Sequence, residues 1–329
     1  MQLPQFEYIR PKSLAEGLAA LAEHGDKIAI MSGGSDLLLN MKFRLEGPAY
    51  LLSLNGLSEL QQLEKLDDGS LRVGAACTLT HLAEHTIIKE CYPALRAAIF
   101  VVGSRHVRNM GTIGGNICLE TRCWYTNQSK IWRDTREGCF KTDAEQCHVI
   151  KSAPKCHALN STDSGPILMA LDASVVLASH TGERIVPMRE FYQNDGVEHT
   201  VLKPGEVLTA VVLPPAKGRS VFRKLSQREG LDFATGTFAA AVIGSNEQPE
   251  SVSLVLGSVA PEPRVMPQAE KILLEGGLTD EAIDAAADVA RRALLEVTNL
   301  FTPTFYKKRL IKVLVKDALL ELRDQRVRG

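Results

Sequence analysis

The sequence predicts an α+β protein of two or three domains. The chain has 329 residues, which is long enough for several hydrophobic cores and excludes a single small module. Strand-like and helix-like segments follow one another along it, and two amphipathic helices finish the chain. The stretch P-P-A-K-G-R-S at 214–220 has the composition of a linker, so we expect a domain boundary there.

Composition and charge narrow the class of protein. Hydrophobic residues make up 45% and charged residues 23% of the chain, as in globular proteins, and no apolar run is long enough to span a membrane. A formal net charge of −1 gives no electrostatic reason to expect nucleic acid as a partner. The N-terminus M-Q-L-P-Q-F-E-Y lacks the basic and apolar regions of a secretory signal. We therefore expect a cytoplasmic protein, whose seven cysteines stay reduced.

Local signals place the first elements. Ser13 can cap a helix over 13–24, where leucine and alanine recur at helical spacing, and Gly25 ends that helix. The segment K-I-A-I-M at 27–31 is typical of a short buried strand. Alternation and turn residues predict strands over 50–55 and 71–77, a threonine-capped helix over 78–85 and a helix over 93–101.

The second half of the chain follows the same logic. The segment P-I-L-M-A-L-D-A at 166–173 predicts a helix, and the segment after it predicts a hairpin that turns at His180-Thr181-Gly182. We expect a strand over 206–213, two strands separated by a polar turn within 221–243, a strand within 251–260, and helices over 279–296 and 304–322.

The strand at 27–31 runs directly into a glycine turn, S-G-G-S-D-L, at 32–37. Glycines let a ligand approach the backbone closely, and successive N–H groups at such a turn can bind a phosphate or pyrophosphate. An ordinary tight turn would have the same pattern. The motif by itself therefore leaves both interpretations open.

A second glycine-dense stretch, R-N-M-G-T-I-G-G-N at 108–116, lies where we expect a strand to end. Gly111, Gly114 and Gly115 remove side chains beside the backbone there. The pattern again indicates close approach of backbone N–H groups to an anionic ligand.

A polar loop with four cysteines follows the second glycine stretch. The spacing is C-x15-C-x7-C-x8-C, formed by Cys123, Cys139, Cys147 and Cys156. The loop holds both tryptophans and few aliphatic residues. It cannot bury enough apolar surface to order itself, so we expect a bound metal to cross-link it. Four thiolates suit zinc or an iron–sulfur cluster, and the spacing matches neither a C-x2-C zinc knuckle nor a bacterial ferredoxin motif. Zinc, a cluster and unliganded thiols all remain open from the residues alone.

Together these motifs resemble the FAD-binding subunits of the xanthine dehydrogenase family of molybdenum enzymes. The resemblance covers essentially the whole chain. It rests on S-G-G-S-D-L at 32–37, R-N-M-G-T-I-G-G-N at 108–116, D-x-x-P at 163–166, F-x-K-x-x-x-R-x-x-x-D at 222–232 and Y-K-K-R-L-I-K-V-L-V at 306–315. It implies a two-part FAD-binding domain of the vanillyl-alcohol-oxidase type and a C-terminal α+β domain. The absence of a Rossmann G-x-G-x-x-G near the N-terminus agrees with this.

The resemblance also implies domain bounds and cofactor residues. Two FAD-binding subdomains would cover 1–57 and 58–217, with an insert at about 120–160, and the C-terminal domain would cover 218–329. Asp163 would accept hydrogen bonds from FAD hydroxyls, and Lys224, otherwise an ordinary strand-end lysine, would lie near the isoalloxazine or ribityl chain. The pyrophosphate would be held by Ala29, Ile30, Met31, Ser32, Gly33, Gly34, Ser35 and Asp36, and by Gly111, Thr112, Ile113, Gly114, Gly115 and Asn116. Gly103 would also bind the cofactor.

Most members of the family lack the cysteine insert. It is similar to the insert in the β subunits of 4-hydroxybenzoyl-CoA reductases, where the loop carries a [4Fe–4S] cluster. By this resemblance Cys123, Cys139, Cys147 and Cys156 are cluster ligands. A one-electron carrier beside a flavin has a redox use that zinc lacks, so we expect FAD and a [4Fe–4S] cluster as cofactors.

The implied function is electron transfer in the reductive dehydroxylation of 4-hydroxybenzoyl-CoA to benzoyl-CoA, a step of anaerobic aromatic degradation. Electrons would pass from reduced ferredoxin through the cluster and FAD to a [2Fe–2S] subunit and a molybdopterin-binding catalytic subunit, in a dimer of heterotrimers. This chain would hold no catalytic residue. The alternatives are the flavoprotein subunit of an oxidising molybdenum hydroxylase for carbon monoxide, nicotinate or aldehydes, and a zinc-stapled docking subunit.

Overall fold

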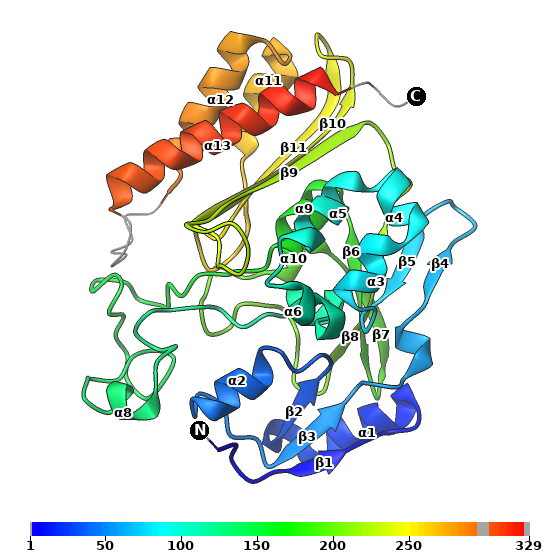
Figure 1. The fold of residues 1–329 in the computed structure, drawn as a ribbon, viewed down its shortest axis with the longest axis vertical. Helices are drawn as coiled ribbons and strands as arrows, with labels where there is room; N and C mark the ends of the chain where they lie inside the picture. Colours follow the sequence, from blue (N-terminus) through cyan, green and yellow to red (C-terminus); the bar gives the residue numbers. More distant parts are fainter. Residues whose placement is uncertain (1, 295–302, 326–329) are drawn as a thin grey trace.

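The computed structural model describes residues 2–294 and 303–325, and within them the chain forms three β-sheets packed with helices (Figure 1). The sheets have three, five and four strands and follow one another along the described chain. The two larger sheets are antiparallel. The predicted α+β fold class is confirmed.

The first sheet is parallel. Its strands lie in the order β1 (Glu7–Ile9), β3 (Tyr50–Ser53) and β2 (Ile28–Met31). The helical elements of this part are α1 (Leu14–His24), the 3-10 turn η1 (Gly25–Lys27) and α2 (Leu37–Lys42). The Ser13 hydroxyl accepts the Glu16 N–H at 3.2 Å, which confirms the predicted helix cap. Because β2 ends at Met31 and α2 begins at Leu37, the first glycine turn lies at the carboxyl end of a strand.

The second sheet forms the middle of the chain. Its strands lie in the order β4 (Leu63–Lys65), β5 (Leu71–Gly74), β8 (Val207–Leu213), β6 (Ser174–Ser179) and β7 (Gly182–Pro187). A 3-10 turn, η2 (Ser58–Leu60), precedes β4. Ser179 pairs with Gly182, so the predicted hairpin turns where the sequence indicates.

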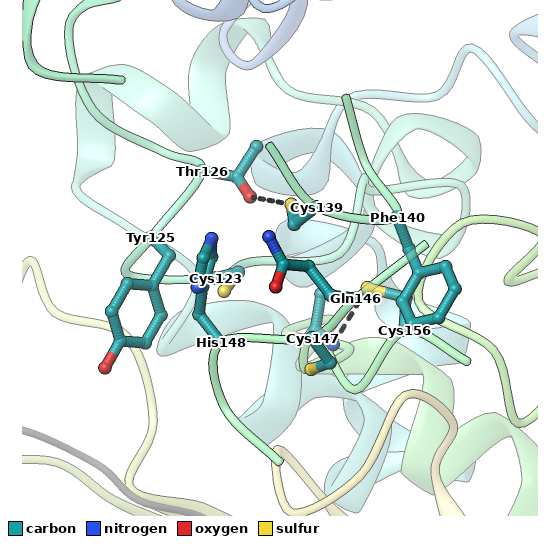
Figure 2. Close-up of a pocket in the computed structure, with 10 residues that line it drawn as sticks. Cys123, Tyr125, Thr126, Cys139, Phe140, Gln146, Cys147, His148 and Cys156 are labelled. Atoms are coloured by element: carbon teal, nitrogen blue, oxygen red, sulfur yellow. Dashed lines mark hydrogen bonds between the residues drawn. The ribbon is translucent and has the colours of Figure 1, made fainter. Parts of the chain in front are cut away.

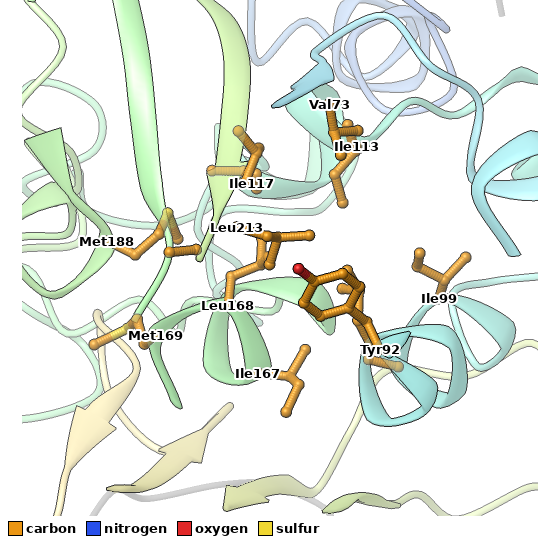
Figure 3. Packing of buried hydrophobic residues seen from close by; sticks show 14 of the residues in the cluster. Val73, Tyr92, Ile99, Ile113, Ile117, Ile167, Leu168, Met169, Met188 and Leu213 are labelled. Carbon is orange, nitrogen blue, oxygen red and sulfur yellow. The ribbon is translucent and has the colours of Figure 1, made fainter. Parts of the chain in front are cut away.

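Short helices pack around this sheet. They are α3 (Leu79–Glu84), α4 (Thr86–Cys91), α5 (Pro93–Phe100), α6 (Arg105–Met110), α7 (Ile113–Ile117), α9 (Ser164–Ala170) and α10 (Met188–Phe191). Every residue of α9 is buried, as expected of a helix that is apolar on all sides. Its Ile167 and Leu168 lie at the centre of the core, beside Tyr92, Ile99 and Leu213 (Figure 3).

The third sheet has two covered faces. It comprises β9 (Arg219–Leu225), β10 (Gly236–Gly244), β11 (Pro249–Gly257) and β12 (Arg264–Val265). The helices that follow in this region are α11 (Pro267–Gly276), α12 (Asp280–Arg292) and α13 (Thr304–Asp324). Side chains alternate along β10: Phe238 and Ala240 pack with Ile311 of α13, whereas Ala239 belongs to the core around α9. The sheet is therefore sandwiched between the C-terminal helices and α5 and α9.

The cysteine insert projects from the fold as a long loop (Figure 1). Arg122 and Leu159 form a β-bridge at its base, with both N–H···O distances at 2.8 Å. Between them the regular structure is a single short helix, α8 (Lys130–Arg133). The insert therefore leaves and re-enters the fold at one point.

Two sequence interpretations are wrong. The strand β2 lies where the sequence predicts it, but none of its residues is buried. The chain before Gly111 is the helix α6 and not a strand, and the G-G-N segment belongs to the helix α7. The hydroxyls of Ser104 and Thr112 cap these helices by accepting the N–H groups of Val107 and Gly115, at 3.3 and 3.1 Å. In α7, the Thr112 cap thus outweighs the low helix propensity of glycine.

The C-terminal helices match their predictions over the residues that the structure describes. α12 ends at Arg292, and residues 295–296 of the predicted helix over 279–296 lie outside the described residues. Within the described part of the chain, no helix combines the length and apolarity needed to cross a membrane.

Candidate functional site

The two glycine turns lie against each other. A Cβ placed on Gly33 would stand 2.0 Å from the Met110 carbonyl oxygen and 2.9 Å from Gly111 Cα. Only a residue without a side chain permits this approach of two backbones. Segments far apart in sequence, predicted to hold one pyrophosphate, are thus brought together.

The first turn offers unused donors. Over residues 2–294 and 303–325, the N–H groups of Gly33, Gly34 and Ser35 donate to no protein acceptor. Gly34 has φ +69°, which side chains rarely adopt, and its carbonyl accepts the Leu38 N–H at 3.2 Å. The Ser32 hydroxyl is buried and likewise has no partner in that part of the chain. Unpaired donors beside a buried hydroxyl fit an anionic ligand.

Most N–H groups of the second turn already donate hydrogen bonds to protein acceptors. Ile113 donates to Cys77 O at 3.0 Å, Gly114 to Ala75 O at 2.9 Å and Asn116 to Thr112 O at 2.9 Å. The Thr112 N–H is the exception, because it donates to no group among the described residues. The second turn would therefore let a ligand come close to its backbone, and the Thr112 N–H would be its hydrogen-bond donor.

Asn116 has a role that the sequence does not reveal. Its side-chain oxygen accepts three hydrogen bonds: from the Ser164 hydroxyl at 2.6 Å, the Ser164 N–H at 3.1 Å and the Thr162 hydroxyl at 3.0 Å. These bonds fix the segment on both sides of Asp163. The second turn thus positions the predicted FAD-hydroxyl acceptor.

Asp163 and Lys224 form a buried ion pair between the middle and C-terminal parts of the chain. The Lys224 Nζ lies 2.8 Å from Asp163 Oδ2 and donates to the Val101 carbonyl at 3.0 Å, close to Gly103. Both side chains are at most 7% exposed. The second carboxylate oxygen, Oδ1, and the hydroxyl of Thr237, which pairs with Lys224 in register, have no partner within the described chain. These buried, unsatisfied polar atoms fit a polar ligand.

Burial raises the pKa of Asp163 to about 6, against an ordinary value of 3.8, although Lys224 lowers it. A carboxylic acid whose pKa is higher in the folded than in the unfolded state adds to the free energy of unfolding below pH 4. This contribution is lost as the pH rises through 6. Between pH 4.5 and 7.5 the flavin-free wild type should therefore lose about 2 kcal/mol of unfolding free energy that Asp163→Asn does not lose. Urea unfolding at the two pH values checks this, with Asp172→Asn, an exposed site, as control. A constant difference between Asp163→Asn and wild type would contradict it.

The four loop cysteines line one cavity (Figure 2). Cys123, Cys139, Cys147 and Cys156 approach it from different segments of the insert. Cys147 and Cys156 are buried, and the other two are half-buried. The other lining residues are Tyr125, Thr126, Phe140, Gln146, His148 and Ala158. Within the described residues, no three histidine, cysteine or acidic side chains converge closely enough to hold a single metal ion.

The thiols are held in a low-polarity environment. Burial raises the pKa of Cys156 to about 12, although the Ala158 N–H, 3.4 Å from its sulfur, and the Lys141 cation oppose the rise. Burial also raises the pKa of Cys123, and the neighbouring Cys139 and Cys147 add to it. Thiolates at these positions need a cationic partner, which a metal centre would supply.

Lys141 anchors the insert to the rest of the protein. Its ammonium pairs with Glu120 and donates to the Thr121 hydroxyl at 2.7 Å and the Gly196 carbonyl at 3.1 Å. A Cβ on Gly196 would stand 2.6 Å from the Cys156 sulfur, so only glycine leaves room here for the Cys156 side chain. Neither residue carries a sequence signal, because their partners lie 20 to 75 residues away.

Comparison with known proteins agrees with this arrangement. Residues 4–216 match the family described as the FAD binding domain in molybdopterin dehydrogenase, and residues 221–322 match the CO dehydrogenase flavoprotein C-terminal domain. The FAD-binding subunit of the aldehyde oxidoreductase of Escherichia coli is 33% identical over 282 residues, covering 82% of this chain and 86% of that protein. The FAD subunit of nicotinate dehydrogenase of Eubacterium barkeri is 26% identical and covers 98% of both chains.

A solved structure shows the same fold. The carbon monoxide dehydrogenase of Hydrogenophaga pseudoflava contains a chain that is 27% identical and superposes with a TM-score of 0.81, covering 98% of each chain. A two-part FAD-binding domain followed by a C-terminal domain is therefore the architecture here. The chain belongs to the family of FAD-binding flavoprotein subunits of molybdenum hydroxylases.

Proposed function

We propose that this chain is the FAD-carrying subunit of an oxidising molybdenum hydroxylase of the aldehyde type, and that its insert holds a [4Fe–4S] cluster. Partners would be a molybdopterin-binding catalytic subunit and a [2Fe–2S] subunit. The observation that carries the proposal is the joining of the two glycine turns, the unused N–H donors and the buried Asp163–Lys224 pair into one site. The aldehyde preference rests on the 33% identity to the Escherichia coli subunit.

This proposal replaces the reductive function expected from the sequence. The relatives described above are named as an aldehyde oxidoreductase and as nicotinate and carbon monoxide dehydrogenases. Those names favour oxidation of the substrate and give no support to dehydroxylation of 4-hydroxybenzoyl-CoA. They also give no support to ferredoxin as donor or to a dimer of heterotrimers. The cytoplasmic location and the domain bounds at 57 and 217 stay predictions.

The residues present fit FAD. Bound FAD would supply a carrier that accepts electrons from the iron–sulfur subunit and releases them to an external acceptor. The N–H groups of Gly33, Gly34 and Ser35 would face the pyrophosphate oxygens, and Asn116 would keep Asp163 in place for a hydroxyl of the cofactor. Lys224, held by Asp163 and Val101, would keep a positive charge beside the site.

We propose a cluster rather than zinc for the cysteine cavity. Tetrahedral zinc draws four sulfurs to about 2.3 Å from one point, whereas a cubane cluster takes one thiolate at each of four separated irons. Four thiols line one cavity, and a one-electron carrier beside a flavin has a redox use that zinc lacks, so we favour the second arrangement. Iron and acid-labile sulfide in the anaerobically purified chain would support it as well, and stoichiometric zinc would contradict it.

Substrate class is tested with the assembled complex. We expect the complex to oxidise aldehydes with an artificial electron acceptor, and the isolated chain to oxidise none, because the partner subunit would hold the molybdenum. Turnover by the chain alone would contradict the subunit assignment. Reduction of 4-hydroxybenzoyl-CoA without aldehyde oxidation would restore the reductive function.

A further inference from the structure

The cysteine insert holds α2 and the first glycine turn from both ends. At the start of α2, the Arg122 guanidinium pairs with the Asp36 carboxylate. Beyond its end, the Arg133 guanidinium donates to the Phe43 carbonyl at 3.1 Å and the Arg44 carbonyl at 2.8 Å. These contacts join residues more than 80 positions apart in the chain.

Arg122 and Arg133 hold α2 at its two ends, and we call this pair of contacts the clamp. Each contact lies where a lost hydrogen bond or ion pair would be costly. The Arg122 side chain is 18% exposed, and burial lowers its pKa. Its guanidinium also lies 5.3 Å from the centre of the Phe233 ring, and its Nε has no partner among the described residues. Arg44 has φ +58°, so its backbone gains from an external hydrogen bond. Such contacts contribute more than exposed surface pairs do.

Arg122 is also coupled to the cysteine cavity. It directly precedes Cys123, and its backbone is bridged to Leu159, three residues after Cys156. Any change that disorders the cavity would release this backbone, and with it the side chain that meets Asp36. The first turn, which carries the unused N–H donors, begins four residues before Asp36.

We propose that the insert is part of the flavin site: Arg122 and Arg133 position the first turn, and Arg122 offsets the negative charge of Asp36 beside the pyrophosphate. FAD affinity then depends on whether the insert is ordered, and hence on its metal centre. This inference rests on the proposed placement of the FAD pyrophosphate at residues 32–36. It gives the insert a second role besides carrying electrons.

The test measures FAD dissociation from the metal-loaded chain by flavin fluorescence. Arg122→Met and Arg133→Met should each weaken FAD binding roughly tenfold, the effect of losing one charge-assisted hydrogen bond, and Arg122→Lys should recover part of the loss. The matched control is Arg136→Met. This arginine lies within the insert, over the rings of Trp132 and Tyr125 at 4.3 and 6.0 Å, away from α2.

A second readout separates positioning from misfolding. Hydrogen exchange of residues 32–44 should become faster in Arg122→Met and in the metal-free wild type, while exchange in β9–β11 stays unchanged. Unaltered FAD affinity and exchange in both arginine variants, with FAD lost on Gly33→Ala, would overturn the clamp and leave the flavin site standing. Full FAD retention by Gly33→Ala would overturn the flavin placement and the clamp together.

Discussion

Replacing Gly33 with alanine should abolish stoichiometric FAD binding. The added methyl group would stand 2.0 Å from the Met110 carbonyl oxygen and 2.6 Å from its carbon, and both are backbone atoms that cannot rotate away. The two turns must then separate, which moves the free N–H groups of Gly34 and Ser35 off their ligand. We expect affinity to fall about a hundredfold, from an overpacking cost of about 3 kcal/mol. The flavin-to-protein ratio after gel filtration measures this.

The control for this variant is Gly47→Ala. A Cβ on Gly47 would meet no atom within 4 Å, so the same chemical change costs nothing in packing there. Gly47→Ala should keep full flavin content. Equal flavin contents in Gly33→Ala and Gly47→Ala would show that the contact between the turns has no part in binding.

Replacing Cys139 with serine should remove the cluster. The serine hydroxyl is a poor ligand for iron, and three remaining thiols leave one corner of a cubane without a thiolate. Iron and sulfide content should fall to near zero, and the paramagnetic signal of the reduced cluster should vanish. The loop has few apolar contacts of its own, so it should also become sensitive to protease. FAD should stay bound with reduced affinity, because the N–H groups of the first turn remain.

Cys91 provides the control for this experiment. It is an exposed cysteine on α4, outside the insert, and Cys91→Ser should retain iron, sulfide and flavin. If Cys139→Ser kept a full complement of iron and sulfide, the cavity residue Cys139 would not be a ligand.

Local signals predict the elements that depend on near neighbours. Ser13, Thr78 and the His180-Thr181-Gly182 turn act on residues a few positions away, and the structure has the predicted helices and hairpin at these places. Capping also explains the error at α6 and α7, where the glycines suggest a turn. The sequence also predicts the turn at the carboxyl end of β2, because a strand-like segment runs directly into two glycines.

Contacts between distant segments escape such reasoning. Lys224 and Asp163 are 61 residues apart, and only the family resemblance pairs them with the flavin. Lys141, Gly196 and Arg122 act through partners on other elements, and an isolated lysine or arginine in a polar loop has no pattern that distinguishes it. The four loop cysteines are different, because their residue type predicts a shared role from the sequence alone.

The narrow base of the insert has an evolutionary consequence. Two backbone hydrogen bonds of 2.8 Å hold Arg122 and Leu159 side by side, and ends this close can be joined by a two-residue hairpin turn. All but two of residues 123–158 can therefore be gained or lost in a single genetic event without moving any sheet strand. An ancestral flavin subunit could acquire an extra electron carrier in this way, as a module added to an existing fold.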